Sequence, residues 1–350
     1  MSSLATRSPE PAWPSAGAPP ACPIVIAHRG ASGYRPEHTL ESYRVAIALG
    51  ADYVEPDLVV TADGVLVARH ENEIGATTDV AAHPRFAHRR TTKNVAGRQV
   101  SGWFVEDFTL AELKTLRARE RLPGIRAHNR FYDGRFEIPT FDEILDLVLA
   151  ETRRLGRRIG VYPEIKQSTH FAAVGLRHEG PLLASLRRAG PRLPAFIQSF
   201  DPATLRALAE RTTVPLVQLV GHDGDLLMPR GLREVSTYAR VLGPRKDLVG
   251  ARNGAGRPGR LVERAHEAGL AVHVWTFRNE NAFLAPEYRH GPEVAAFGDA
   301  LGEYATFLGL GVDGVFTDHP DTARSAVAAQ ASERSHQSRE SDRDEQHRCR

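Results

Sequence analysis

Short apolar runs alternate with helix-forming stretches along most of this chain, and the alternation predicts its secondary structure. The apolar runs predict strands at 24–28, 53–58, 159–164, 195–199, 214–220, 241–243, 271–275 and 314–317. The stretches between them predict helices at 39–49, 141–155, 202–211, 232–240, 260–268 and 301–308. Strands that are apolar along their whole length are typical of a parallel sheet whose faces are covered by helices.

One further apolar run, at 65–70, follows the dipeptide Asp63-Gly64, which indicates a hairpin. Without that strand the chain has about eight β/α units, the number found in a TIM-type (β/α)8 barrel. A doubly wound open sheet is the alternative. It is disfavoured because no Gly-rich dinucleotide-binding turn follows the first strand. We therefore predict an α/β fold with a TIM-type barrel over residues 24–324.

Three segments depart from this alternation. Residues 71–136, directly after the hairpin, have few periodic apolar runs and many Arg and His residues, which predicts a long irregular region. Residues 1–23 are rich in Ala, Pro and Ser, and residues 325–350 are almost wholly polar, so both ends are expected to be disordered. The leader lacks the apolar run of about 7–15 residues that a secretory signal needs. We expect a cytoplasmic protein, or a periplasmic or secreted one if the start is misassigned.

The balance of charged residues limits the kinds of molecule that this protein is expected to bind. Lys and Arg total 45 against 43 Asp and Glu, a formal charge of +2. A nucleic-acid or membrane-surface binder needs a concentrated basic field, so neither partner is expected. No stretch approaches the length of a membrane span. Cys22 and Cys349 have no Cys or His neighbour at zinc-ligand spacing. A small molecule is the expected partner, and the sequence leaves the oligomeric state open.

Polar residues gather where the predicted strands end. In TIM-type barrels the active site lies at the carboxyl ends of the strands, so these residues predict a single polar pocket. They are His28 and Arg29, Glu55 and Asp57, His70, Glu164 and Lys166, Gln198 and Ser199, and Asp318 and His319.

Three of these residues form a candidate metal site. Glu55 and Asp57 are two residues apart on one strand, so their side chains leave by the same face. With Glu164 from the next barrel strand they would bring three carboxylates together, and such a cluster repels itself. A hard divalent cation such as Ca²⁺ or Mg²⁺ resolves the conflict, because both prefer oxygen ligands. The alternative is three separate salt bridges at the rim of the barrel.

The remaining candidates suit phosphodiester cleavage. One group must activate the nucleophile and another must protonate the leaving oxygen, and the imidazoles of His28 and His70 are suited to both tasks. Arg29 can bind phosphate oxygens by a bidentate fork, and Lys166 can add a point charge. Trp275 could form an apolar wall of the substrate pocket, or it could belong to the packing of the barrel.

These residues lie in segments that resemble motifs of the glycerophosphodiester phosphodiesterase family. The segments are 26–40 (IAHRGASGYRPEHTL), 50–57 (GADYVEPD), 162–166 (YPEIK), 272–276 (VHVWT) and 313–318 (DGVFTD). They occur in the family's order and span nearly the whole predicted barrel.

The resemblance implies a metal-dependent hydrolase on a TIM-type barrel. It implies that Glu55, Asp57 and Glu164 hold the metal and that His28 and His70 act as acid and base. The long segment 71–136 then resembles the insertion that caps the substrate in the larger, periplasmic-type bacterial branch, whose metal is usually Ca²⁺. The family usually has Asp directly after the second catalytic His, whereas this chain has Glu71, one methylene longer.

The expected reaction is hydrolysis of glycerophosphodiesters, such as glycerophosphocholine or glycerophosphoethanolamine, to sn-glycerol 3-phosphate and an alcohol. Two alternatives stay open. A lysophospholipase D or sphingomyelinase D would use the same metal chemistry and would cleave lysophosphatidylcholine in preference to glycerophosphocholine. A catalytically inactive barrel would only bind glycerophosphodiesters and would release no glycerol phosphate.

Overall fold

The computed structural model describes residues 22–222, 224–250 and 260–333. The strands are β1 Ile24–His28, β2 Tyr53–Glu55, β3 Asp57–Val60, β4 Leu66–Ala68, β5 Thr91–Val95, β6 Arg98–Gly102, β7 Gly160–Val161, β8 Glu164–Ile165, β9 Ile197–Ser199, β10 Leu216–Val220, β11 Val241–Pro244, β12 Ala271–Phe277 and β13 Gly314–Thr317. The α-helices are α1 Leu40–Ala48, α2 Leu110–Leu113, α3 Phe141–Leu155, α4 Ser168–Ala173, α5 Glu179–Ala189, α6 Pro202–Ala209, α7 Pro229–Val235, α8 Lys246–Gly250, α9 Leu261–Glu267 and α10 Ala300–Gly309.

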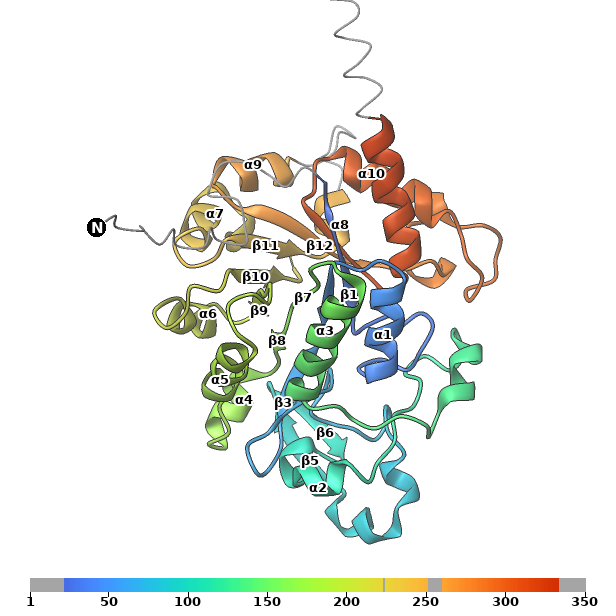
Figure 1. Cartoon of the computed structure of the whole chain (residues 1–350), viewed down its shortest axis with the longest axis vertical. Helices are drawn as coiled ribbons and strands as arrows, with labels where there is room; N and C mark the ends of the chain where they lie inside the picture. Colours follow the sequence, from blue (N-terminus) through green and yellow to red (C-terminus); the bar gives the residue numbers. More distant parts are fainter. Residues whose placement is uncertain (1–21, 223, 251–259, 334–350) are drawn as a thin grey trace, which may run out of the picture.

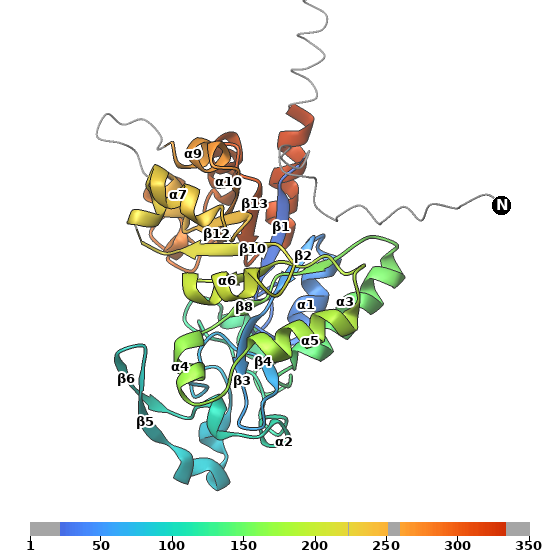
Figure 2. The same ribbon diagram turned by 90° about the vertical axis from the view of Figure 1, so that its left-hand side faces the viewer.

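The parallel strands close into a barrel. β1 pairs with β2 on one side and with β13 on the other, and β8 through β13 pair in chain order. The gap is closed by β2 pairing with β7 and β3 with β8. Because β2 and β3 continue one another, as do β7 and β8, the ring has eight strand positions. The TIM-type barrel that the alternation predicts is confirmed, with helices around its outside (Figures 1 and 2).

Two predicted strands are each divided in the structure. The strand predicted at 53–58 is interrupted at Pro56, and the one predicted at 159–164 is interrupted at Tyr162 and Pro163. Proline lacks the N–H that a continuous ladder needs, so a break at these positions follows from its chemistry. The barrel pairing nevertheless continues across both breaks, since Glu164 N–H donates to the Pro56 carbonyl at 2.9 Å.

Helix α3 shows why the local sequence folds as it does. The Thr140 hydroxyl accepts a hydrogen bond from the Glu143 N–H at 3.1 Å, and the Glu143 carboxylate accepts one from the Thr140 N–H at 2.7 Å. This capping box starts the helix. Gly156 ends it in the left-handed conformation, with φ of 64°. The helix therefore occupies the range that the sequence predicts, 141–155.

The interior of the barrel is filled by side chains rather than open. A compact cluster of buried residues comes from strands or strand ends on different sides of the ring, as is usual for the core of a TIM-type barrel. Its members are Ile26, Tyr162, Phe196, Val217, Val241 and Phe316. A much larger apolar core lies between the strands and the surrounding helices.

The insertion contains more structure than its composition predicts. β5 and β6 form an antiparallel hairpin that projects from the barrel (Figure 2). Short 3-10 turns occur at Val80–Ala82, Pro84–Arg89, Val105–Asp107 and Ala127–Tyr132. Further 3-10 turns lie outside the insertion at Asp225–Leu227, Asn281–Phe283 and Pro286–Tyr288.

The prediction that the chain is disordered from residue 325 is wrong for its first part. Residues 320–333 form a helix, at the red end of the colour scale in Figure 1. Ala326 and Val327 are buried against the main core, with 7% and 3% of their surface exposed. The mainly polar composition of this segment does not predict that these two side chains pack on the core. The remainder of the predicted tail and residues 1–21 lie outside the described residues.

Candidate active site

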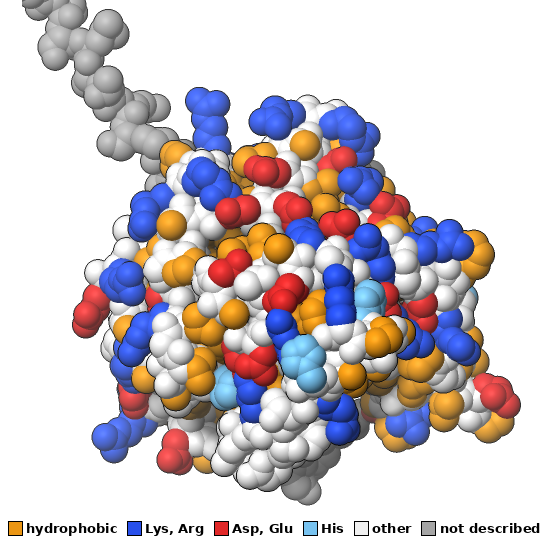
Figure 3. Space-filling view, turned by 90° about the horizontal axis from the view of Figure 1, so that it is seen from below, with side chains coloured by type: hydrophobic (Ala, Val, Ile, Leu, Met, Phe, Trp, Pro, Cys, Tyr) orange, Lys and Arg blue, Asp and Glu red, His pale blue; other side chains and the backbone are white. Residues whose placement is uncertain are grey.

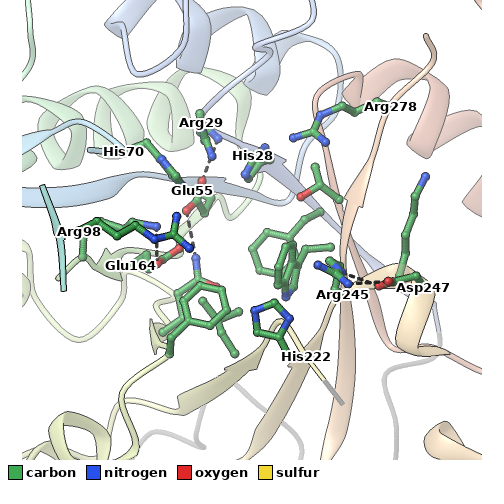
Figure 4. Close-up of a pocket in the computed structure, with 18 residues that line it drawn as sticks. His28, Arg29, Glu55, His70, Arg98, Glu164, His222, Arg245, Asp247 and Arg278 are labelled. Atoms are coloured by element: carbon green, nitrogen blue, oxygen red, sulfur yellow. Dashed lines mark hydrogen bonds and ion pairs between the residues drawn. The ribbon is translucent and has the colours of Figure 1, made fainter. Parts of the chain in front are cut away.

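The polar strand ends converge on one cleft, as the sequence predicts. The cleft has a volume of about 730 Å³. Five of the eight predicted site residues line the bottom of this cleft, and Gln198 lies beside them. The five are His28, Arg29, Glu55, Glu164 and Lys166. His70 lies at the same end (Figure 4). Trp275 also lines the cleft. Asp57 is 1% exposed and lies directly behind this floor.

The three predicted metal ligands lie together. Glu55, Asp57 and Glu164, the acidic triad, each offer an oxygen atom within 4.8 Å of the others. Glu55 and Asp57 flank the Pro56 break, and Asp57 is the register partner of Glu164 across the β3–β8 pair. All three are buried. The alternative of three separate rim salt bridges is therefore wrong.

The charges within the acidic triad do not balance in the protein alone. Burial, together with the charges of Asp57 and Glu164, raises the pKa of Glu55 well above its usual value. Burial also raises the pKa of Glu164, to about 8. The pKa of Asp57 is held low although burial acts the other way, because Lys166, His70 and Arg29 are near it. Without a further cation, the cluster tends to retain protons at neutral pH.

Two cations of the chain meet the acidic triad. Lys166 Nζ lies 2.8 Å from Glu164 and 3.7 Å from Asp57. Arg29 Nε lies 3.2 Å from Asp57, and its backbone N–H donates to the Glu55 carboxylate at 2.9 Å. Arg29 adopts a φ of 60°, a region that non-glycine residues rarely occupy. This conformation turns the chain directly after β1, so that both the amide and the guanidinium face the acidic triad.

Each of the two histidines is held by a carboxylate. His28 Nδ1 lies 2.7 Å from Asp318 Oδ1, and His70 Nδ1 contacts the Glu71 carboxylate. The additional methylene of Glu71 therefore does not prevent its contact with His70. An ionised carboxylate can only accept, so Nδ1 carries the proton in both rings and Nε2 is left for the cleft.

The pKa of both histidines is lowered. Burial is the largest cause, and it lowers the pKa of His28 and of His70 to about 4. The positive charge of Arg29 acts in the same direction on both rings, and Lys166 adds to it at His70. A neutral imidazole with a free Nε2 can accept a proton from a nucleophile.

The wall of the cleft combines aromatic and charged groups. Trp275 Nε1 donates to the Gly243 carbonyl at 2.8 Å, and its ring meets Phe200 edge-on at 5.6 Å. Arg245 and Asp247 form an ion pair on the side opposite the acidic triad, whereas Arg98 of the insertion extends over Glu164 (Figure 4). The cleft therefore offers an apolar wall and several charges beyond the phosphate-sized region around the acidic triad.

Sequence reasoning left the contacts of three neighbours open. Asp318 ends the last strand and holds His28; its position at a strand end was the available signal. His38 is fully buried, and its Nε2 lies 2.9 Å from Asp57 Oδ2. Glu37 accepts from Arg29 Nη1 at 2.9 Å. Both occur within the segment 26–40 that carries the family resemblance, but only the folded chain reveals whom they contact.

The acidic triad fits a divalent metal. Its donors are all carboxylate oxygens, the ligand type that Ca²⁺ and Mg²⁺ prefer. Its members are buried and mutually repulsive, and the raised pKa values of Glu55 and Glu164 mark charge that a cation would compensate. The site can therefore hold a divalent cation. The donor set alone does not select between these two metals.

Comparison with known proteins identifies the family. A family model described as the glycerophosphoryl diester phosphodiesterase family matches residues 28–322. The chain belongs to this family. The phosphodiesterase that the sequence motifs predict is thereby confirmed at the level of the family, and every predicted site residue lies within the matched range.

Relatives of this phosphodiesterase occur in plants and bacteria. Glycerophosphodiester phosphodiesterase GDPD6 of Arabidopsis thaliana is 35% identical over 85% of this chain and 83% of its own length. A glycerophosphodiester phosphodiesterase of Haemophilus influenzae is 31% identical over 85% of this chain and 88% of its own length. The chain thus spans most of both relatives.

Solved structures share the fold. A putative glycerophosphoryl diester phosphodiesterase from Silicibacter pomeroyi superposes with a TM-score of 0.63, at 23% identity, over 89% of this chain and 95% of that one. A phosphodiesterase from Oleispira antarctica, in complex with the product sn-glycerol-3-phosphate, gives 0.61 at 21% identity, over 88% and 97% of the two chains.

The surface gives no sign of an extended charged field on the face seen in Figure 3, where Lys and Arg side chains are interspersed with Asp and Glu. Within the described ranges, no helix combines the length and apolar character needed to cross a bilayer.

Proposed function

We propose that this family member hydrolyses glycerophosphodiesters, such as glycerophosphocholine or glycerophosphoethanolamine, to sn-glycerol 3-phosphate and an alcohol. The proposal rests on the acidic and histidine side chains that lie together at the carboxyl ends of the barrel strands. Three carboxylates within 4.8 Å of one another lie beside two imidazoles, each with its Nδ1 bonded to a carboxylate. The relatives from Arabidopsis thaliana and Haemophilus influenzae are named for the same activity.

Each predicted residue takes one role in this proposal. Glu55, Asp57 and Glu164 hold a divalent cation, with Ca²⁺ preferred and Mg²⁺ as the second candidate. When bound, such a cation stabilises the negative charge that develops on the phosphate oxygens. Arg29 and Lys166 orient the phosphate from the same side.

The two histidines transfer the protons. Nε2 of one neutral ring removes the proton from the attacking O–H group. The other ring enters the step as an imidazolium, with protons on both Nδ1 and Nε2, and gives its Nε2 proton to the leaving alcohol oxygen. Asp318 and Glu71 keep Nδ1 protonated, so that Nε2 remains the reactive nitrogen throughout. Trp275 supports the glycerol or alcohol carbons with its apolar ring face.

The test is the release of the alcohol head group, choline or ethanolamine, after chelation and metal add-back. The protein is treated with EDTA, supplied with CaCl₂ or MgCl₂, and assayed on glycerophosphocholine, glycerophosphoethanolamine and lysophosphatidylcholine. We expect activity on the two glycerophosphodiesters, its loss with EDTA, and its recovery with added metal. Glu112→Gln, a carboxylate change outside the cleft, serves as the control.

Two results would contradict the proposal. Preference for lysophosphatidylcholine would assign the cleft to a lysophospholipase D. No release from any substrate with either metal present, by a protein that melts normally, would leave a barrel that binds without catalysis.

A further inference from the structure

The insertion sends two arginines behind the active site. Arg121 and Arg126 flank a tight turn in which the N–H groups of Ile125 and Arg126 both donate to the Leu122 carbonyl, at 2.9 and 2.8 Å. The Glu120 carboxylate accepts from the Leu122 N–H at 2.7 Å and fixes the start of this turn. Neither arginine is among the residues that line the cleft in the described part of the chain.

Arg126 connects the insertion to His28. Its side chain is 4% exposed. Nη2 donates to Asp318 Oδ2 at 2.6 Å, and Nε donates to Glu280 at 2.6 Å. The other oxygen of Asp318, Oδ1, holds His28 Nδ1. Arg126 also donates to the Ser32 carbonyl at 2.9 Å, in the turn that follows β1.

Arg121 makes the corresponding connection to His70. Nη1 and Nη2 donate to the two oxygens of Glu71 at 3.0 and 2.6 Å, and Glu71 contacts His70 Nδ1. The same guanidinium donates to both oxygens of Glu37, from Nε at 2.7 Å and from Nη2 at 2.6 Å. Glu37 in turn holds Arg29 at 2.9 Å.

We propose that Arg121 and Arg126 are positioning residues, each fixing the carboxylate that orients one histidine of the catalytic pair. This inference rests on the proposed function of His28 and His70. Through two arginines five positions apart, the insertion then holds both of these carboxylates from behind. At Asp318 it shares Oδ2 with Arg278, whose Nε donates to that oxygen at 2.7 Å. Arg121 has a second task, because it also fixes the carboxylate that holds Arg29.

The geometry explains why arginine is needed. A carboxylate that is bonded at both oxygens cannot rotate, and a permanent positive charge beside it keeps it ionised. Such a carboxylate only accepts hydrogen bonds, so the Nδ1 proton of the imidazole stays in place. Lysine would retain the charge, but its single nitrogen cannot reproduce the fork that engages two carboxylates at once.

The kinetic test compares Arg126→Lys and Arg121→Lys with Arg89→Lys. Arg89 forms a bidentate pair with Glu112 in the same insertion, outside the cleft, and is therefore a matched control. We expect Arg126→Lys to lower kcat by about 10–100-fold with KM nearly unchanged, since misplacing a catalytic group by about 1 Å can cost that much. Arg121→Lys lowers kcat comparably and also raises KM, because it releases Arg29. Arg89→Lys changes neither.

A second substrate separates positioning from general loosening. Glycerophospho-4-nitrophenol has a leaving group that needs no proton, whereas the choline of glycerophosphocholine does. The arginine that positions the general acid should show a much larger loss on glycerophosphocholine than on the nitrophenyl ester, and the other arginine should show equal losses on both. Equal losses on both substrates in both variants, or a wild-type kcat in either variant, would overturn the proposal.

Nitrogen NMR of the histidine rings provides a readout without turnover. We expect both rings of the wild-type protein to carry their proton on Nδ1. Arg126→Lys should shift the ring signals of His28 and leave those of His70 unchanged. Arg121→Lys should shift those of His70 most, with a smaller change at His28 because Arg29 is released. An Nε2–H tautomer in the wild type refutes the proposal even if neither variant folds. Because this measurement needs no substrate, an inactive wild type with the expected tautomers would count against the proposed function and not against the positioning.

Discussion

Replacing Glu55 by Gln separates the metal-binding role of the acidic triad from its role in the fold. Glu55 accepts from the Arg29 N–H at 2.9 Å and from the Gln198 side-chain amide at 3.1 Å. A glutamine side chain has the same shape as glutamate, so its oxygen can still accept the hydrogen bond from the Arg29 N–H. It keeps the second hydrogen bond if Gln198 turns its own amide over, so that Gln198 Oε1, which has no hydrogen-bond partner in the described part of the chain, accepts from the new amide. This turn gives up the longer bond from Gln198 Nε2 to the Tyr162 carbonyl, at 3.4 Å.

The electrostatic gain from this change is considerable. Two carboxylates 4.8 Å apart repel one another by about 3 kcal/mol at an effective dielectric constant of about 20. Glu55→Gln removes the charge that takes part in two such repulsions, and it resembles the protonated state that the raised pKa of Glu55 favours. We therefore expect the metal-free variant to be at least as stable as the metal-free wild type.

The cation should stabilise only the complete triad. A ligand at about 100 times its Kd stabilises the folded state by about 2.7 kcal/mol. Losing one of three charged ligands weakens binding, so most of this gain should disappear in Glu55→Gln at the same metal concentration. The measurement is the melting temperature of both proteins in EDTA and in CaCl₂ or MgCl₂, with Asp247→Asn as a cleft carboxylate outside the triad.

Two outcomes would refute this reasoning. An equal rise in melting temperature on adding metal to the wild type and to Glu55→Gln would mean that Glu55 is not a ligand. A metal-free variant that melts well below the metal-free wild type would mean that the three carboxylates do not repel one another strongly enough to require a cation.

Two further predictions concern catalysis and the end of the chain. His28→Ala and His70→Ala should each lower kcat by about 10²–10⁴-fold without changing the circular dichroism spectrum, and near-normal turnover in either would remove that ring from the mechanism. A chain ending at residue 324 should lose about 1.5–3 kcal/mol of unfolding free energy through Val327 alone, because a buried valine contributes about that much. Urea denaturation measures this loss, and an unchanged midpoint would show that the helix at 320–333 does not support the core.

The sequence predicts the barrel strands and the Glu55–Asp57 pair well because both depend on local rules. Strand residues two apart share a face, so Glu55 and Asp57 point together whatever the rest of the chain does. Helix α3 carries its own start and stop signals in Thr140 and Gly156. Where local rules suffice, prediction and structure agree.

The features that the sequence does not predict depend on contacts between distant segments. Helix 320–333 packs on the core through the small apolar side chains of Ala323, Ala326 and Val327, and most of its other residues are polar or alanine. The hairpin β5–β6 lacks a strong alternating pattern. Arg121 and Arg126 are two among many arginines of the insertion, and no spacing in the sequence indicates that one of them meets Asp318, 192 residues away.

Closure of the barrel has a consequence for how the protein is made. His28 is carried by the first strand, whereas its carboxylate partner, Asp318, follows the last one, 290 residues later. Synthesis of the chain reaches His28 long before it reaches Asp318. Long-range pairing of this kind forms late in folding. A nascent chain that has reached Glu164 therefore already contains the acidic triad and both histidines, but His28 can meet its carboxylate partner only after Asp318 has been synthesised.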